Sequence, residues 1–136
     1  MLANLLAMTV SRTTQTPVPR IARRVIYGAF ALALLVAIVK SHAAHPVSWW
    51  QVSAFGLGPD IALLLTLTPG LERGRMHPRA VPLYNALHRP AGPAALAALA
   101  GVVPNRLIVG ALAWGFHISW DRAIGYGLRS RDGWQR

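Results

Sequence analysis

The stretch Trp114-Gly-Phe-His117-Ile-Ser-Trp-Asp121-Arg122 leads from an uncharged apolar segment directly into ionisable side chains. On a helix, His117 and Asp121 are spaced i, i+4 and lie on one face, with Trp114 one turn earlier on the same side. The segment 107–120 before them contains no Lys, Arg, Asp or Glu. An imidazole and a carboxylate are therefore predicted at or just inside the end of a membrane span, where ionisable groups are costly and tend to mark function.

The composition of the 136-residue chain is typical of a membrane protein. Hydrophobic residues make up 54% and charged residues 13%, whereas about a quarter of the residues of a soluble domain are charged. The formal net charge is +10, but the basic residues lie in the breaks between apolar segments and form no patch interleaved with aromatic residues, so no nucleic-acid partner is expected. Because the chain has no cysteine, any metal would have to bind His, Asp, Glu or Asn side chains.

Apolar segments separated by polar breaks predict an all-α membrane protein with four transmembrane helices. The predicted spans are residues 25–39, 47–68, 81–103 and 107–120. The first is short for a span of about 20 residues, but flanking Arg and Lys side chains can reach the membrane surface. Pro59 and Asp60 interrupt the second span, and Pro90 and Pro93 interrupt the third, where we expect the helix to kink or restart.

The chain is predicted to form one membrane domain between two basic tails. Residues 1–24 are expected to be a flexible N-terminal tail, because their second half is rich in Thr, Pro and Arg and cannot bury a core. Residues 25–128 hold the four predicted spans. Residues 129–136 are a short, polar and basic C-terminal tail.

The distribution of Lys and Arg predicts that both termini are cytoplasmic. The N-terminal tail, the loop 69–80 and the C-terminal segment hold four, three and four basic residues, against one each, Lys40 and Arg106, in the other two breaks. By the positive-inside rule, the basic segments face the cytoplasm and the anionic headgroups of the bilayer. The sequence therefore predicts a multi-pass protein of the inner (cytoplasmic) membrane.

This topology places the rare polar residues of three spans at one depth. At about 1.5 Å per residue, Asp60 lies about 12 Å from the cytoplasmic end of its span, His88 about 13 Å and His117 about 8 Å. A carboxylate at the centre of a membrane helix costs about 2.5–3.5 kcal/mol, so Asp60 is expected to face other helices and not lipid. The alternative is a protonated Asp60 that is hydrogen-bonded to a helix and has only a structural role. We predict that these side chains meet in the inner leaflet.

Three motifs carry a resemblance to a known family. They are Pro59-Asp60, Tyr84-Asn85-x-x-His88 and His117-Ile-x-x-Asp121-Arg122-x-x-Gly-Tyr-Gly-Leu128. In order and spacing the chain resembles, over residues 48–129, the small bacterial integral-membrane family of domain of unknown function 4260. The resemblance implies a four-helix membrane protein without an assigned activity. The chain departs from the family after His88, where Arg89-Pro90 replaces a more aromatic, apolar continuation.

The first functional hypothesis is a metal-dependent hydrolase that acts on a membrane-associated substrate. The catalytic residues and metal ligands would be two carboxylates and two imidazoles: Asp60, His88, His117 and Asp121. Such a set can bind zinc, manganese or iron and leave an open position to activate water. Asn85 would contact the substrate or lie outside the ring of metal ligands. Arg122 would bind a lipid phosphate. The order Pro-Asp, His, His-x-x-x-Asp also resembles, more distantly, that of membrane-bound metal-dependent hydrolases.

The second hypothesis is a membrane protein that is not an enzyme. Asp60, His88 and His117 would form a proton or ion relay, or a polar clamp between helices in which Asp121 and Arg122 form an ion pair. In the clamp version the protein has a structural or partner-binding role. The sequence indicates no particular protein partner.

Overall fold

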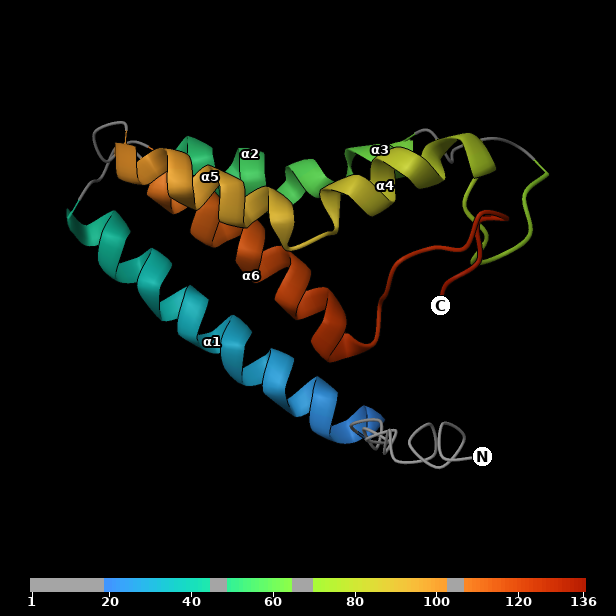
Figure 1. The fold of residues 1–136 in the computed structure, drawn as a ribbon, viewed down its shortest axis with the longest axis horizontal. Coiled ribbons are helices and arrows are strands. Elements are labelled where there is room, and N and C mark those ends of the chain that lie inside the picture. Colours follow the sequence, from blue (N-terminus) through green and yellow to red (C-terminus); the bar gives the residue numbers. More distant parts are fainter. Residues whose placement is uncertain (1–18, 45–48, 65–69, 103–106) are drawn as a thin grey trace, which may run out of the picture.

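The computed structural model describes residues 19–44, 49–64, 70–102 and 107–136 (Figure 1). Its elements are α1 (Arg20–Ala44), α2 (Trp49–Leu57), the 3₁₀ helix η3 (Gly58–Asp60), α3 (Ile61–Leu64), the 3₁₀ helix η4 (Pro78–Ala80), α4 (Val81–Leu87), α5 (Ala91–Val102) and α6 (Ile108–Ile124). Within these residues the one β-type contact is an isolated bridge between Arg129 and Gln135. The described part of the chain therefore confirms the predicted all-α class.

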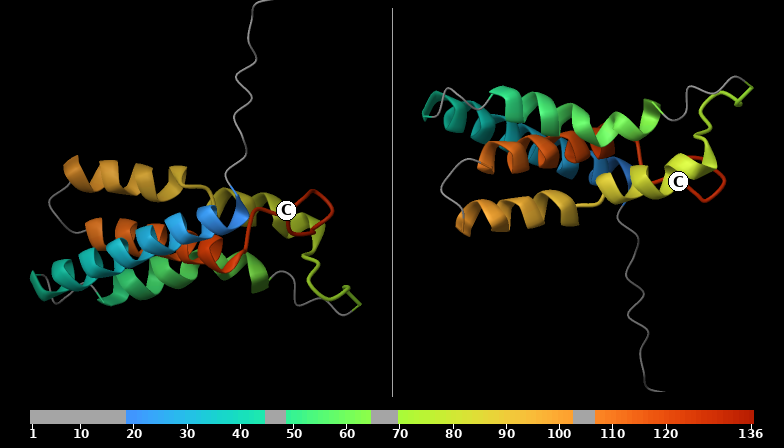
Figure 2. Two further views of the ribbon diagram at one scale, coloured as in Figure 1. Left: turned by 90° about the horizontal axis from the view of Figure 1, so that it is seen from below. Right: turned by 90° about the horizontal axis from the view of Figure 1, so that it is seen from above.

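Helix α6 is the central element of the fold. It packs against α1, α2 and α5, which surround it in Figure 2. Its small residues allow close approach of the neighbouring helices, as is usual for helices that pack in lipid. The Phe55 ring of α2, for example, occupies the space in which a side chain at Gly110 would lie. A helix that is apolar on most sides is expected at the centre of a bundle.

The start of α6 also depends on a buried polar side chain. The backbone N–H of Gly110 lies in the first turn, where N–H groups have no partner within the helix. Gln51 of α2 is 4% exposed, and its Oε1 accepts a hydrogen bond from this N–H at 2.9 Å. No sequence pattern predicted this contact, which joins α2 to α6.

Helix α1 is longer than the predicted span 25–39. It begins at Arg20 and continues to Ala44, so the basic residues used as boundaries lie inside the helix. Arg and Lys are good helix formers, and a change in polarity does not by itself end a helix. Among the described residues α1 is the one helix that is long and apolar enough to cross a membrane.

The second and third predicted spans are both interrupted. Pro59 lies at the start of η3, which separates α2 from α3. Pro90 lies between the end of α4 at Leu87 and the start of α5 at Ala91. The predicted breaks are thus confirmed, and neither described segment is one straight helix of spanning length. The predicted ends of these spans at 47, 48, 65–68 and 103 lie outside the described residues, as do the turn 104–106 and most of the N-terminal tail.

Helix α6 extends beyond the predicted end at Trp120. It continues to Ile124, and Gly125 ends it with φ +105° and an N–H that donates to the carbonyl of Asp121 at 3.0 Å. A glycine in the left-handed region is a common helix C-cap, and Arg122 in the last turn is favourable with the helix dipole. Asp121 and Arg122, which follow the predicted end of the span, are therefore part of the helix.

The basic segments gather at one end of the molecule. The start of α1, the segment 70–80 and the C-terminus all lie at this end in Figure 1. The C-terminal segment folds back onto the segment 74–76: the Met76 N–H donates to the Gly133 carbonyl at 3.0 Å, and Arg129 Nη1 donates to the Gly74 carbonyl at 2.6 Å. The division of the chain into two tails and a membrane domain stays a prediction.

Candidate metal centre

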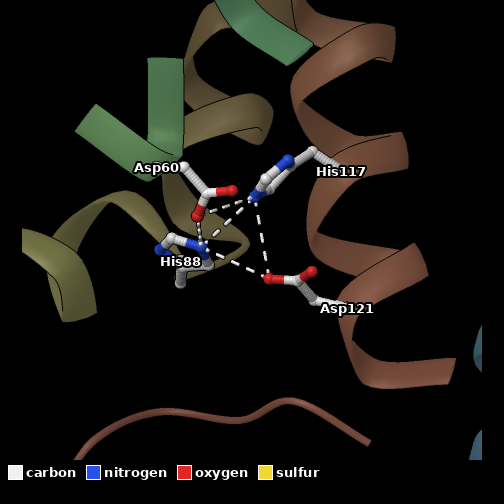
Figure 3. A group of neighbouring side chains, drawn as sticks. All are labelled: Asp60, His88, His117 and Asp121. Carbon is white, nitrogen blue, oxygen red and sulfur yellow. Dashed lines mark hydrogen bonds and ion pairs between the residues drawn. The ribbon is translucent and has the colours of Figure 1, made fainter. Parts of the chain in front are cut away.

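The four predicted ligands lie together, although they come from three separate segments (Figure 3). Asp60 ends η3, His88 follows α4, and His117 and Asp121 lie on consecutive turns of α6. Each side chain offers one ligand atom, and these atoms all lie within 4.8 Å of one another. The structure therefore shows the convergence that was predicted from the depth of these residues. Their catalytic and metal-binding roles stay predictions.

The distances between the ligand atoms suit a single ion. His88 Nε2 lies 3.4 Å from Asp60 Oδ1 and 3.4 Å from Asp121 Oδ2. His117 Nε2 lies 3.7 Å and 3.6 Å from the same two oxygens, and 3.2 Å from His88 Nε2. A tetrahedral ion with bonds of about 2.0–2.2 Å holds its ligands about 3.3–3.6 Å apart. These five distances match the ligand spacing around one divalent cation, and the ligand atoms of the two carboxylates lie within 4.8 Å of each other.

The end of α4 orients the imidazole of His88. Its Nδ1 lies 2.9 Å from the Tyr84 carbonyl. A carbonyl only accepts, so Nδ1 must donate and carry the proton. In the neutral ring, the lone pair is then on Nε2, which faces the other three ligands. A backbone carbonyl is a usual partner for the second ring nitrogen of a histidine that binds a metal.

Contacts on both sides hold His88 in place. The ring of Tyr84 stacks on the imidazole with centroids 3.8 Å apart, and Arg122 Nη2 donates to the His88 carbonyl at 3.2 Å. The guanidinium of Arg129 lies 5.6 Å above the Tyr84 ring.

The backbone before His88 is also held by α6. Trp114, predicted on the same face of α6 as the candidate ligands, donates from Nε1 to the Leu87 carbonyl at 2.8 Å. The break between α4 and α5 is therefore tied to α6 on both sides of His88.

The centre is accessible from the side of Asp60. The side chain of His88 is 1% exposed and that of Asp121 17%, but that of Asp60 is 43% exposed. The two imidazoles and the Asp121 carboxylate form the buried wall. Asp60 therefore lies on the open side of the cluster.

Asn85 and Arg122, which were predicted to contact the substrate and a lipid phosphate, form hydrogen bonds to backbone groups beside the centre, and their binding roles stay predictions. The Asn85 amide forms two hydrogen bonds with the backbone of Arg129: Oδ1 accepts from N at 2.8 Å, and Nδ2 donates to O at 2.9 Å. It therefore anchors the C-terminal segment. Arg122 donates to the carbonyls of His88 and Tyr126, so it positions a ligand from behind.

The ion pair expected between Asp121 and Arg122 does not form in the described structure. Asp121 faces the two imidazoles, and Arg122 faces backbone carbonyls. The physical reason is that neighbouring residues on a helix do not face each other.

Arg129 was not predicted to support the centre. It follows the helix in sequence, and only tertiary contacts bring its side chain to the Tyr84 ring.

Comparison with known proteins identifies the family. No curated protein and no solved structure matches the chain significantly. A family model described as a domain of unknown function matches residues 25–136, which include all four candidate ligands. The chain therefore belongs to the family of domain of unknown function 4260.

Proposed function

We propose that this protein is a multi-pass membrane protein that binds a divalent cation (zinc, manganese or iron) and hydrolyses a membrane-associated substrate. The ligands are Asp60, His88, His117 and Asp121. The observation that carries the proposal is the convergence of two imidazoles and two carboxylates at spacings that suit one ion. A cation held there would supply a Lewis acid and activate water for attack on an ester or phosphate bond. The exposed side chain of Asp60 marks the open side.

Charge balance supports a cation at this position. Asp60 and Asp121 present two oxygens to each imidazole Nε2 at 3.4–3.7 Å. Two carboxylates in one partly buried cluster are natural ligands of a divalent cation, which supplies the opposite charge. The neutral imidazole is the form of histidine that binds metals.

The broken backbone beside the centre supports a position within the membrane. Backbone outside a helix is tolerated at membrane depth only where other groups satisfy its hydrogen bonds. At the break between α4 and α5, Trp114 donates to the Leu87 carbonyl and Arg122 donates to the His88 carbonyl. Side chains of α6 thus replace the missing helical donors.

The surface of α1 also supports membrane insertion. Only 11% of its most apolar 18-residue window is buried within the protein. Large apolar side chains along it, such as Val25, Phe30 and Leu32, are 55–65% exposed. A continuous apolar surface along a whole helix is unusual for a protein in water, whereas it is the surface that lipid chains cover.

Cysteine labelling would test the proposed topology, because the chain has no cysteine of its own. We expect a membrane-impermeant maleimide added to intact spheroplasts to label Ala44→Cys, at the end of α1, but not Glu72→Cys or Asp132→Cys at the basic end. All three should react after permeabilisation, since all three positions are exposed. Equal labelling of the three positions before permeabilisation would place them on the same side of the membrane. This result would contradict the cytoplasmic termini, the contact of the basic end with anionic headgroups and the multi-pass arrangement.

Metal analysis would test the proposed centre directly. We expect protein purified without a histidine tag to hold about one divalent ion per chain by elemental mass spectrometry, because four ligands are already in place. Chelation should remove the ion, and zinc or manganese should restore it with the same stoichiometry. A folded protein that takes up no metal after reloading would refute the metal-dependent hydrolase.

The second candidate is the proton relay or clamp, and one observation favours it. The His88 and His117 Nε2 atoms are 3.2 Å apart, which is also a hydrogen-bond distance. Without a metal, one imidazole would donate to the other, and the carboxylates would share the remaining protons. Absence of metal together with proton flux into vesicles, lost in Asp60→Asn, would favour the relay. Absence of both would favour the clamp.

A further inference from the structure

An apolar cavity lies beside the proposed metal centre. Its volume is about 460 Å³, within the usual range for small-molecule sites. Helices α1, α2 and α6 form its walls, with side chains such as Ile38, Val52 and Phe116. None of the described residues that line it is Asp, Glu, Lys or Arg. Apart from the Trp indoles, its polar side chains are His42, Ser53 and His117, so a long polar ligand would leave most of its desolvation uncompensated.

His117 connects this cavity to the metal centre. The residue lines the cavity, while its Nε2 lies 3.7 Å from Asp60 Oδ1 and 3.6 Å from Asp121 Oδ2. Leu57, another lining residue, directly precedes η3, which carries Asp60. Of the four candidate ligands, His117 lines the cavity, so a molecule there can contact this imidazole. The other surroundings of the molecule are mostly apolar side chains.

We infer that the cavity binds one hydrocarbon chain of an amphiphilic substrate, whose polar, hydrolysable group lies at the His/Asp centre. This inference rests on the proposed function and names its substrate class. The mostly apolar walls favour a chain of CH₂ groups because burial of apolar surface is the main interaction that they offer. The change from apolar side chains to the His117 imidazole, whose Nε2 lies 3.6–3.7 Å from the two carboxylates, matches the change from chain to headgroup in a lipid.

The position of α1 indicates how such a chain enters. The cavity is partly open, and α1, which contributes Leu35 and Val39 to its wall, is mostly unburied along its apolar length. If α1 spans the bilayer as proposed, a chain enters sideways from the lipid phase and does not cross water. Hydrolysis would then release a chain that returns to the bilayer by the same opening.

Gly56 provides a way to fill the cavity without changing the centre. It lines the cavity, and no heavy atom lies within 4 Å of the position that its Cβ would take. Gly56→Phe should therefore place a ring in the space for the chain, and phenylalanine is a better helix former than glycine. Gly101→Phe is the matched control, because Gly101 lies in α5, also has open space at its Cβ position and does not line the cavity.

The test is photocrosslinking of the full chain in nanodiscs with hexadecanoic acid that carries a diazirine in mid-chain. We expect adducts on residues 35–42 and 49–57, competed by unlabelled hexadecanoic acid, because the chain lies between α1 and α2. Gly56→Phe should lower this labelling at least fivefold, and Gly101→Phe should leave it within twofold of wild type. Equal labelling in all three proteins, or labelling spread along the outward surface of α1 without competition, would show ordinary contact with bilayer lipid and overturn the inference.

Bound metal measured on the same samples separates this inference from the proposed function. Gly56→Phe should keep wild-type metal content, because no ligand is changed. Metal without competed labelling would refute the chain site and leave the centre intact. Competed labelling without metal would refute the hydrolase while retaining a chain-binding cavity.

Discussion

His88→Gln is expected to lower zinc affinity at least about 100-fold, since changes to the partners of metal ligands alone cost about 10–100-fold. His88 is the least exposed of the four ligands, and its Nε2 is 3.2–3.4 Å from the ligand atoms of the other three. Glutamine keeps a polar group near the Tyr84 carbonyl but removes the imidazole lone pair. Affinity would be measured by competition with a fluorescent zinc indicator in detergent.

Two further variants keep this result interpretable. Asp121→Asn preserves shape, removes one anionic ligand and should also lower zinc affinity strongly, because a carboxylate binds a cation better than an amide does. His77→Asn is the matched control: His77 is not part of the centre, its Nδ1 accepts from the Arg79 N–H, and asparagine can keep this cap. Folding would be checked by helix content and elution profile. Wild-type zinc affinity in folded His88→Gln would exclude this imidazole as a ligand.

Gly133→Ala is expected to detach the C-terminal segment from the segment 74–76. Gly133 has φ +92°, and a Cβ there would overlap the backbone carbonyl of Met76. The left-handed conformation costs a residue other than glycine about 1–2 kcal/mol, and a backbone group cannot rotate away as a flexible side chain can. The hydrogen bond from the Met76 N–H to the Gly133 carbonyl should break, and hydrogen exchange at Met76 and over residues 129–136 should accelerate at least tenfold.

The same variant should weaken the metal centre indirectly. Detachment would move Arg129 away from the Tyr84 ring and from the Asn85 side chain. These two contacts of Arg129 support the end of α4, where the Tyr84 ring stacks on His88. We expect about a tenfold loss of zinc affinity, the size of effect seen when the support of a ligand is lost. Gly74→Ala is the control, because Gly74 has φ +82° but open space at the Cβ position. Equal effects of the two variants would show that conformational strain, and not the contact with Met76, decides the outcome.

Residue type and spacing predicted which side chains gather at the centre and where two helices break. Asp60, His88 and His117 are rare polar residues in apolar segments, and in a bundle of such segments they are expected to face one another because apolar surroundings offer them no partner. Proline has no N–H and blocks the preceding helical turn, so breaks at Pro59 and Pro90 followed from residue type alone. The spacing of His117 and Asp121 placed both on one side of α6 for the same local reason.

The partners of the remaining polar groups and the space for a hydrocarbon chain depend on how the helices pack together. Asn85 lies three residues before His88 and Arg122 directly follows Asp121, yet their side chains bind backbone groups of Arg129, His88 and Tyr126. The cavity is formed by side chains of α1, α2 and α6, and its open space at Gly56 depends on how these helices pack. Hydrophobic periodicity shows which face of a helix is apolar. The backbone group that a polar side chain binds, and the volume that a cavity leaves open, depend on the relative positions of several helices, which no single segment encodes.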